Sequence, residues 1–395
     1  MQLAQRLADF PPYVFAALGR RIGQMQREGI DVIRLDIGSP DLPPAPFILD
    51  ELTAAARQAN KHGYGGYFGR PSLRRAMATY YERRFEVSLD PDDQILPLIG
   101  SKEGIFNIAL AFVNPGDVVL VPDPGYPTYS GGTRIAGGEI VTMPLLAEND
   151  FLPDLEQIPG DVADRARLMW LNYPNNPTAG LATAEFFARA VAFCRAHNIL
   201  LCHDAPYTEV TFDGYCAPSL LQTPGAEQVA LEFNSLSKSY NMAGWRVGIA
   251  AGNRDAIEAL GLLKSNIDSG LSLAVQAAAE TALTGDQSWL VGRNAIYRER
   301  RDIVLAGLAA AGLEARTPQA TLYVWARIPQ GTTSAEFADE LLSEQAVSVA
   351  PGHAFGAHGE GYVRFSLGQA TERLQEAMER IKRKTQTRNR REYHQ

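Results

Sequence analysis

Short apolar runs alternate with helix-forming stretches between residues 45 and 285 of this 395-residue chain, and this alternation constrains the fold more than any other feature. The runs lie at residues 118–121, 139–142, 167–171, 199–203, 229–233 and 247–251. Strands that are buried on both faces carry continuous apolar runs, and parallel strands need long, usually helical, crossovers. The pattern therefore predicts an α/β fold with a mostly parallel sheet sandwiched by helices.

The pattern changes after about residue 286. A long charged helix is expected through residues 293–301, followed by strands near 322–327 and 362–367 with helices between them. This change predicts a smaller α+β domain over residues 286–395, next to a large domain over residues 45–285. A length of 395 residues also suggests about two domains.

Composition narrows the class of protein. The formal net charge of −8 disfavours nucleic acid and anionic membranes as partners, and no apolar run approaches the ~18 residues of a membrane span. The first ten residues lack the apolar segment of a secretory signal. The exception to the acidic balance is the basic tail from Arg380 to Arg391, which is expected to be a solvated helix end.

The spacing of cysteines and histidines indicates neither a disulfide framework nor a metal site. The three cysteines show no Cys-x-x-Cys spacing and are expected to be reduced packing residues of a cytoplasmic protein. Cys194 and Cys202 fall in an expected helix and strand. The six histidines show no metal-ligand spacing, so no metal site is predicted.

One lysine stands among hydroxyl side chains in the stretch SLSKSYNMAGWRVG at residues 235–248. Lys238 has Arg246 eight residues further on, and nearby positive charge favours a neutral, nucleophilic amine. The group suits a phosphorylated aldehyde cofactor. If that aldehyde is pyridoxal 5'-phosphate, Lys238 would form the Schiff base, and Ser235, Ser237 and Arg246 would bind the phosphate. By itself the stretch leaves a solvated Ser/Lys-rich turn open as an alternative.

Three more polar side chains follow predicted strands. Asp204 follows the run at 199–203, Tyr207 comes three residues later, and Asn176 follows the run at 167–171. Ligands in open α/β sheets bind beyond the carboxyl ends of strands, where a carboxylate can keep a pyridine nitrogen protonated and a tyrosine can donate to the ring oxygen. Singly, these residues could be a helix cap, a half-buried aromatic and a turn. Together they favour one site.

A helix is expected to begin at Ser101, after a strand-like run at residues 94–99, because apolar residues recur at helical spacing from Ile105 to Phe112. The free amides of a helix start can bind a phosphate, although Ser101 could also be an ordinary N-cap. Lys102 could contact the phosphate or a substrate carboxylate, or lie in solvent.

With these residues in place, the chain resembles the class I/II aminotransferases, which are pyridoxal-phosphate enzymes of fold type I. The resemblance covers nearly the whole chain. It implies that Tyr64 reaches the cofactor phosphate in the neighbouring subunit of a homodimer, that GSKEG at 100–104 is the phosphate-binding helix start, and that Tyr126 stacks on the cofactor ring. It also implies that residues 1–44 join the smaller domain.

The resemblance also implies substrate-binding residues. Arg364 matches the arginine that binds the α-carboxylate, and Gly38 matches a glycine whose backbone approaches the same carboxylate. Asn176 and Lys102 would contact substrate as well as cofactor, and Tyr13 and Asn266 would touch substrate. The alternatives are an outward strand residue for Arg364, a turn glycine for Gly38, a packed aromatic for Tyr13 and a helix-linking asparagine for Asn266.

Four stretches, at residues 122–129, 143–153, 266–270 and 359–365, look closest to the LL-diaminopimelate aminotransferase-like group. This implies transfer of the amino group of LL-2,6-diaminopimelate, an intermediate of lysine biosynthesis, to 2-oxoglutarate by a ping-pong mechanism through an aldimine with Lys238. Lys238 would move the proton, Asp204 would stabilise the protonated ring, and Tyr207 and Asn176 would hold the ring oxygen. The alternatives are an aminotransferase for alanine, aspartate or aromatic amino acids, or a lyase, decarboxylase or racemase on the same fold.

Two rivals come from other classes. A transcription regulator on this fold would need an added DNA-binding segment, and a nicotinamide-dependent dehydrogenase would need Gly-x-Gly-x-x-Gly straight after its first strand. The glycines at 63, 65, 66 and 69 do not fit that spacing. The chain departs from the family in one place, since Ala179 precedes Gly180 where relatives usually have Asn-Pro-Thr-Gly. The turn after Asn176 is therefore expected to take a slightly different path.

Overall fold

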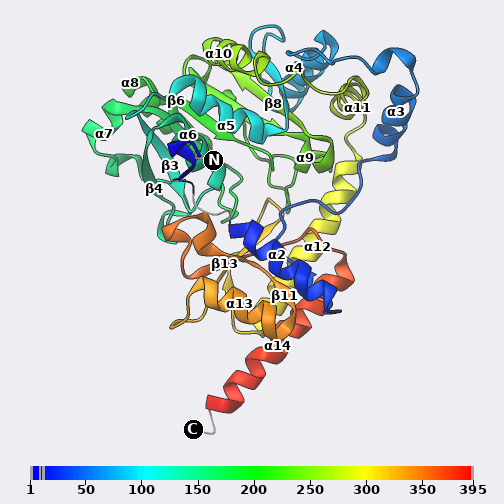
Figure 1. Ribbon diagram of the computed structural model, residues 1–395, viewed down its shortest axis with the longest axis vertical. Helices are drawn as coiled ribbons and strands as arrows, with labels where there is room; N and C mark the ends of the chain where they lie inside the picture. The colour runs from blue at the N-terminus through cyan, green and yellow to red at the C-terminus, as the bar shows by residue number, and fades with distance from the viewer. Residues whose placement is uncertain (1–2, 9, 11–13, 393–395) are drawn as a thin grey trace.

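The larger sheet is built from the apolar runs found in the sequence (Figure 1). The computed structural model describes residues 3–8, 10 and 14–392, and within these ranges seven strands form this sheet, in the order β2-β8-β7-β6-β5-β3-β4. The strands are β2 (Ile95–Ile99), β3 (Val118–Asp123), β4 (Glu139–Pro144), β5 (Ala166–Asn172), β6 (Leu200–Asp204), β7 (Ala230–Ser235) and β8 (Val247–Gly252). β8 runs antiparallel to β2 and β7, and the other neighbours are parallel. The prediction of a mostly parallel sheet is confirmed.

Helices cover both faces of this sheet. One face packs against α5 (Ser101–Phe112), α6 (Pro127–Ala136) and α10 (Arg254–Ser265), and the other against α4 (Pro71–Phe85), α8 (Ala184–His197) and α11 (Leu273–Thr284). In β5, Leu168 and Trp170 face the first layer, while Met169 and Leu171 face the second. Burial on both sides explains why the strands carry unbroken apolar runs.

The smaller sheet lies below the larger one in Figure 1 and follows the predicted change of pattern. Its order is β12-β13-β10-β9, and its two longest strands, β10 (Tyr323–Arg327) and β13 (Tyr362–Ser366), pair antiparallel. The remaining strands are β9 (Glu314–Ala315) and β12 (Ala350–Pro351). The helices on this side are α12 (Trp289–Ala310), α13 (Ser334–Gln345) and α14 (Thr371–Glu392).

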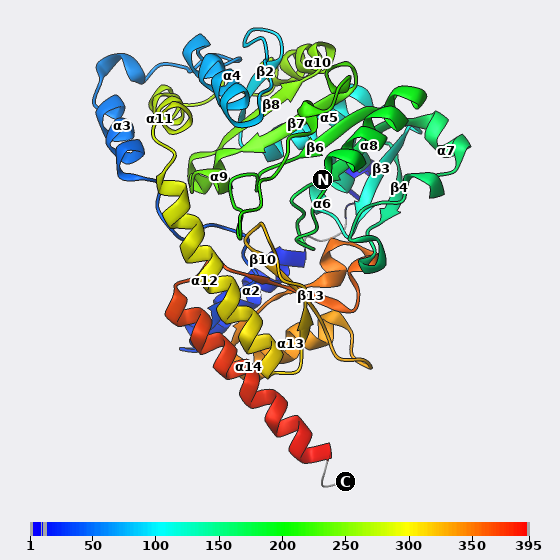
Figure 2. The same ribbon diagram turned by 180° about the vertical axis from the view of Figure 1, so that it is seen from behind.

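The N-terminal segment lies against the C-terminal part of the chain. β1 (Ile33–Arg34) pairs in parallel with β11 (Val347–Ser348), and Ile22 of α2 (Val14–Arg27) packs on Leu342 of α13. The remaining α-helices are α3 (Pro46–Ala56), the short α7 (Gly160–Arg165), and α1 (Gln5–Ala8) and α9 (Leu236–Ser239), which are single turns. α12 runs from the large sheet's side to the small sheet's side (Figure 2). We propose the boundaries 1–44, 45–285 and 286–395 for the two domains and the segment that joins the smaller one.

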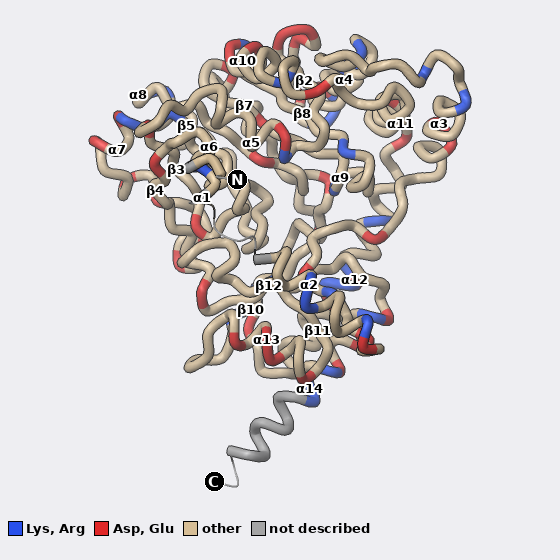
Figure 3. Tube along the Cα trace, viewed as in Figure 1, with Lys and Arg blue, Asp and Glu red and all other residues tan. Residues whose placement is uncertain are grey.

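The cysteines show where one expectation was wrong, and the basic tail begins with ion pairs. Acidic and basic residues are interspersed over the described chain (Figure 3). Arg380, at the start of the basic tail, is not simply solvated, because it forms ion pairs with Asp31 and Glu376. Cys194 and Cys202 are buried as expected, but Cys216 is exposed and is not a packing residue. Across the ranges given above, no helix is long and apolar enough to cross a membrane.

Candidate active site

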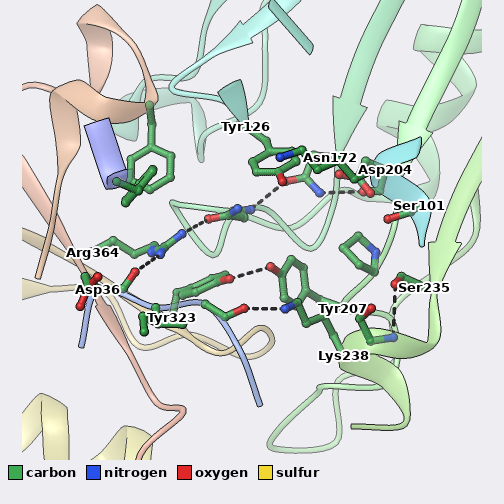
Figure 4. Close-up of a pocket in the computed structure, with 18 of the residues that line it drawn as sticks. Asp36, Ser101, Tyr126, Asn172, Asp204, Tyr207, Ser235, Lys238, Tyr323 and Arg364 are labelled. Carbon is green, nitrogen blue, oxygen red and sulfur yellow. Dashed lines mark hydrogen bonds between the residues drawn. The ribbon is translucent and has the colours of Figure 1, made fainter. Parts of the chain in front are cut away.

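The carboxyl ends of the parallel strands open into a cavity of about 340 Å³ between the two sheets (Figure 4). Asn172 ends β5 and Asp204 ends β6, and the two residues are register partners, so both side chains reach the same edge. The cavity brings together twelve of the predicted site residues: Gly38, Ser101, Lys102, Tyr126, Asn176, Asp204, Tyr207, Ser235, Ser237, Lys238, Arg246 and Arg364.

Lys238 lies on the short helix α9, directly after β7, and its amine points into the cavity (Figure 4). Its Nζ donates to the carbonyl oxygen of Gly38 at 2.5 Å. Burial, together with the positive charges of Arg364 and Arg246, lowers the pKa of Lys238 to about 8. About a tenth of the amine is therefore uncharged at pH 7 and available as a nucleophile or base, far more than for a lysine with the ordinary pKa. The alternative of a solvated turn is wrong, because this stretch is part of the cavity wall.

Asp204 is held in place but keeps one oxygen unused. Tyr129 donates to its Oδ2 at 2.8 Å, while Oδ1 is buried and has no hydrogen-bond partner. Burial raises the pKa of Asp204 to about 6. A buried acceptor without a donor is costly, and a protonated ring nitrogen would supply both the missing hydrogen and a compensating charge. Asp204 ends a strand, so it is not a helix cap.

Two asparagines connect the strand ends to Arg364. Asn172 donates from Nδ2 to the backbone oxygen of Asp204 at 2.7 Å and accepts from the backbone N–H of Asn176 at 2.8 Å. The Oδ1 of Asn176 accepts from Nη1 of Arg364 at 2.7 Å. Asn176 is followed by a cis peptide bond to Pro177. Its side chain thus joins the cofactor side of the cavity to the expected carboxylate-binding side.

Arg364 is a buried cation, 4% exposed, on strand β13. Nη2 donates to the backbone oxygen of Asp36 at 2.7 Å, and Nε has no partner. The guanidinium lies 4.1 Å from the ring centroid of Tyr323 and 4.9 Å from that of Phe355. An enclosed guanidinium with spare donors suits a carboxylate ligand. The alternative of an outward strand residue is wrong.

The hydroxyl groups of Tyr207 and Tyr323 form a hydrogen bond. The two oxygens are 2.7 Å apart, and burial raises the pKa of Tyr207 well above its usual value, so the phenol is protonated at neutral pH. Tyr323 also limits position 38, because a side chain on Gly38 would collide with its ring. Gly38 is therefore more than a turn residue.

The predicted phosphate site is formed by three elements. α5 begins at Ser101 with Gly100 at the N-cap position, so Ser101 is the first helical residue and not the cap. The Oγ of Ser235 accepts from the backbone N–H of Ser237 at 3.2 Å, and Arg246 reaches the Oγ of Ser237 at 3.4 Å. Free helix amides, hydroxyls and a guanidinium form a donor set that suits a phosphate dianion.

Tyr126 and Lys102 form one wall of the cavity. Tyr126 is at the N-cap position of α6, and the Nζ of Lys102 lies 5.9 Å from the centroid of its ring. Lys102 lines the cavity while remaining exposed, so the structure leaves a solvated lysine open as an alternative.

Three predicted residues are not brought into this cavity. Tyr64 is 89% exposed. Asn266 is exposed after the end of α10, where its Nδ2 donates to the oxygen of Leu262 at 2.9 Å. Tyr13 falls outside the described residues.

The analysis of the sequence missed several cavity residues. Asn172 ends a strand, so the rule that identified Asp204 would also have found it. The others come from separate elements and carry no local signal: Phe15, Arg34, Asp36, Ile37, Pro206, Tyr323 and Phe355.

The fold and the cavity define an enzyme of one class. A family model described as aminotransferase class I and II matches residues 30–381, and the chain belongs to this family. Enzymes of this family depend in general on pyridoxal phosphate. The resemblance found in the sequence is confirmed, and the dehydrogenase alternative is wrong.

Particular relatives are similar over almost their whole length. The chain is 50% identical to the LL-diaminopimelate aminotransferase of Moorella thermoacetica over 383 residues, 97% of this chain and 98% of the relative. It is 37% identical to the substrate-bound BacF structure from Bacillus subtilis, with a TM-score of 0.94 and 98% of each chain covered. A Thermus thermophilus aspartate aminotransferase mutant shows 29% identity and a TM-score of 0.91 over 97% of this chain and 99% of the other. These neighbours confirm the fold type I architecture.

Proposed function

We propose that this aminotransferase uses pyridoxal 5'-phosphate to move the amino group of LL-2,6-diaminopimelate to 2-oxoglutarate in two half-reactions. The substrate assignment rests on the 50% identity to an LL-diaminopimelate aminotransferase over 97% of the chain. The cofactor assignment rests on the buried Oδ1 of Asp204, which has no partner of its own and lies in the same cavity as Lys238.

The residues fit the cofactor from its phosphate to its ring. Ser101, Ser235, Ser237 and Arg246 would hold the phosphate, Asp204 the ring nitrogen, and Tyr207 and Asn176 the ring oxygen, with Tyr126 against the ring face. The bound cofactor supplies an electron-accepting ring and an aldehyde that reacts with amines.

The protein residues bind the substrate and move the proton. Arg364 binds the α-carboxylate through its fork of donors, next to the backbone of Gly38. Lys238, whose pKa of about 8 leaves part of its amine neutral, takes the proton from the α-carbon and returns it. Asp204 stays ionised beside the protonated ring nitrogen, while Asn176 links the ring side to Arg364 through its 2.7 Å hydrogen bond. Lys102 is part of the proposed substrate wall.

A homodimer in the cytoplasm is part of the proposal. Large apolar side chains are exposed in the segment before α4 and at the end of α10: Tyr64, Tyr67, Phe68, Leu262 and Ile267. Phe68 lies against α10, since a side chain at Gly261 would meet its ring. Monomers rarely expose contiguous apolar surface of this kind, so a second copy is the expected cover. Tyr64 would then reach the neighbouring cavity, and Asn266 and Tyr13 are proposed as further substrate contacts.

The test is a donor screen with 2-oxoglutarate, read as glutamate formed, beside borohydride reduction of the cofactor-loaded protein. We expect LL-2,6-diaminopimelate to react and reduction to fix the cofactor on Lys238. If that donor were inert while alanine, aspartate or phenylalanine reacted, the substrate assignment would be wrong. A protein that binds no pyridoxal phosphate would refute the whole proposal.

A further inference from the structure

A buried cation behind the phosphate site has no part in the function proposed so far. Lys264, near the end of α10, is 1% exposed, and its Nζ lies 3.1 Å from both carboxylate oxygens of Glu103 and 2.8–2.9 Å from those of Asp268. Two acids thus share one lysine. Lysine side chains are rarely buried so deeply unless they are paired, and the pairing itself offsets only part of the cost of burial. The position of Lys264 and its two acids therefore needs a reason.

Glu103 ties the group to the helix start that is proposed to bind phosphate. It lies in the first turn of α5, two residues after Ser101, and its Oε2 accepts from the backbone N–H of Ile99 at 2.6 Å. Burial raises the pKa of Glu103 despite the nearby lysine. The helix dipole stabilises an acidic group in the first turn, but the charge of that group would repel a phosphate dianion bound at the same amides. Lys264 supplies the neutralising charge.

Asp268 extends the group toward the segment that carries Tyr64. Its Oδ1 accepts from the backbone N–H of Gly270 at 2.7 Å, and the backbone of Gly270 packs tightly on that of Gly66. One buried lysine therefore contacts the turn that begins α5 and, through Asp268, the loop that supports residues 65–66.

We propose that Lys264 is a positioning residue for the cofactor phosphate: it cancels the charge of Glu103 behind the start of α5 and fixes that turn relative to the loop of Asp268. The inference rests on the proposed function, because it requires a phosphorylated cofactor in the cavity. It predicts an effect specific to the phosphate group, which general loss of stability would not produce.

The experiment compares pyridoxal 5'-phosphate with pyridoxal, which lacks the phosphate, by fluorescence titration of the cofactor-free protein. Lys264→Met leaves two acids without a neighbouring cation, and we expect it to weaken binding of the phosphorylated form about tenfold more than binding of pyridoxal. The double variant Glu103→Gln/Lys264→Met removes the charge next to α5 and returns the group to its wild-type net charge, now on Asp268 alone, so it is expected to recover most of that difference. Glu103→Gln alone keeps the lysine and should shift the preference toward the phosphorylated form.

Arg301→Met is the matched control. Arg301 is also a buried cation, 5% exposed, and it pairs with Asp213; neither residue lines the cavity. The Arg301→Met variant should have a lower thermal midpoint of unfolding but the wild-type preference between pyridoxal 5'-phosphate and pyridoxal. Equal losses for both ligands in Lys264→Met, or no recovery in the double variant, would overturn the inference. If Lys264→Met does not fold, a shift of Glu103→Gln toward pyridoxal would overturn it instead. Failure of the wild type to bind pyridoxal 5'-phosphate would refute the proposed function itself.

Discussion

At the scale of single residues, burial in the same cavity shifts the pKa values of Asp204 and Lys238 in opposite directions. Burial raises the pKa of the carboxyl to about 6 and lowers that of the amine to about 8. Each shift moves the group toward its neutral form near pH 7. A cationic ring nitrogen at Asp204 would reverse the first shift, because an adjacent positive charge favours the carboxylate.

Replacing Asp204 by asparagine tests the charge rather than the shape. Asparagine retains an oxygen that can accept from Tyr129 but cannot neutralise a ring nitrogen. We expect the Asp204→Asn protein to bind pyridoxal 5'-phosphate while its kcat falls by about 100- to 1,000-fold, the usual effect of removing a preorganised electrostatic contact. Steady-state rates, together with the absorbance of the bound cofactor, measure both properties. A variant with the wild-type kcat would contradict the role of Asp204.

The lowered pKa of Lys238 predicts a pH-dependent cost to stability. A lysine whose pKa falls from 10.5 to about 8 on folding destabilises the cofactor-free protein below pH 8, and the cost disappears as pH rises toward 10.5. The full shift corresponds to at most about 3 kcal/mol. Lys238→Met should therefore be more stable than the wild type at pH 7, with a smaller advantage at pH 9.5. Urea unfolding at the two pH values measures the difference, and an advantage that did not change with pH would refute this explanation.

At the scale of elements, the junction between β2 and α5 depends on one glycine. Gly100 has φ +74°, and a side chain there would collide with the guanidinium of Arg246. The tight junction lets a helix start and an arginine face the same point. A second junction, after Asn176, also has a positive φ, but at a residue that is not glycine: Ala179 has φ +58°. The structure thus places this non-glycine residue in the left-handed region, at the position where a different path was expected.

Gly100→Ala should damage the site as well as the backbone. Gly100 has φ +74° and ψ 150°, a conformation that is essentially open to glycine alone and costs another residue about 1–3 kcal/mol. Displacement of Arg246 should additionally weaken binding of pyridoxal 5'-phosphate. Gly116→Ala is the matched control, because Gly116 has φ +88° but open space around a new side chain. Thermal unfolding should show a loss for both variants, the larger one for Gly100→Ala because of the collision, whereas cofactor titration should show weaker binding for Gly100→Ala alone. Equal affinities would contradict the proposed crowding at the phosphate site.

At the scale of the whole molecule, the proposed dimer depends on the exposed apolar surface around α10. Leu262 is 69% exposed there, and a glutamate in its place would carry charge into the interface. We expect Leu262→Glu to sediment as a monomer and to lose most of its activity, because the cavity would lack Tyr64 from the neighbouring chain. Leu146→Glu is the control: Leu146 is 37% exposed beyond β4, at the opposite edge of the sheet from β2. A fully active Leu262→Glu monomer would show that each cavity is complete within one chain.

The sequence by itself determined the α/β architecture, the position of the larger sheet and twelve of the residues that line the cavity, of which Gly38, Tyr126 and Arg364 followed only from the resemblance to the family. It could do so because burial on both faces leaves unbroken apolar runs, and because strand ends at one edge of a parallel sheet place Asp204 and Asn176 together. The bounds of β5, β6 and β7 differ from the apolar runs by only one or two residues.

Only the tertiary structure decided what surrounds those residues. The pKa of Lys238 depends on burial and on Arg364, which is 126 positions away in the sequence, and Tyr323 and Asp36 enter the cavity from elements with no catalytic signature. The pairing of Lys264 with Glu103 likewise joins two residues that are 161 positions apart, on different helices. Burial and charge act through space, so their effects are set by which distant elements pack together.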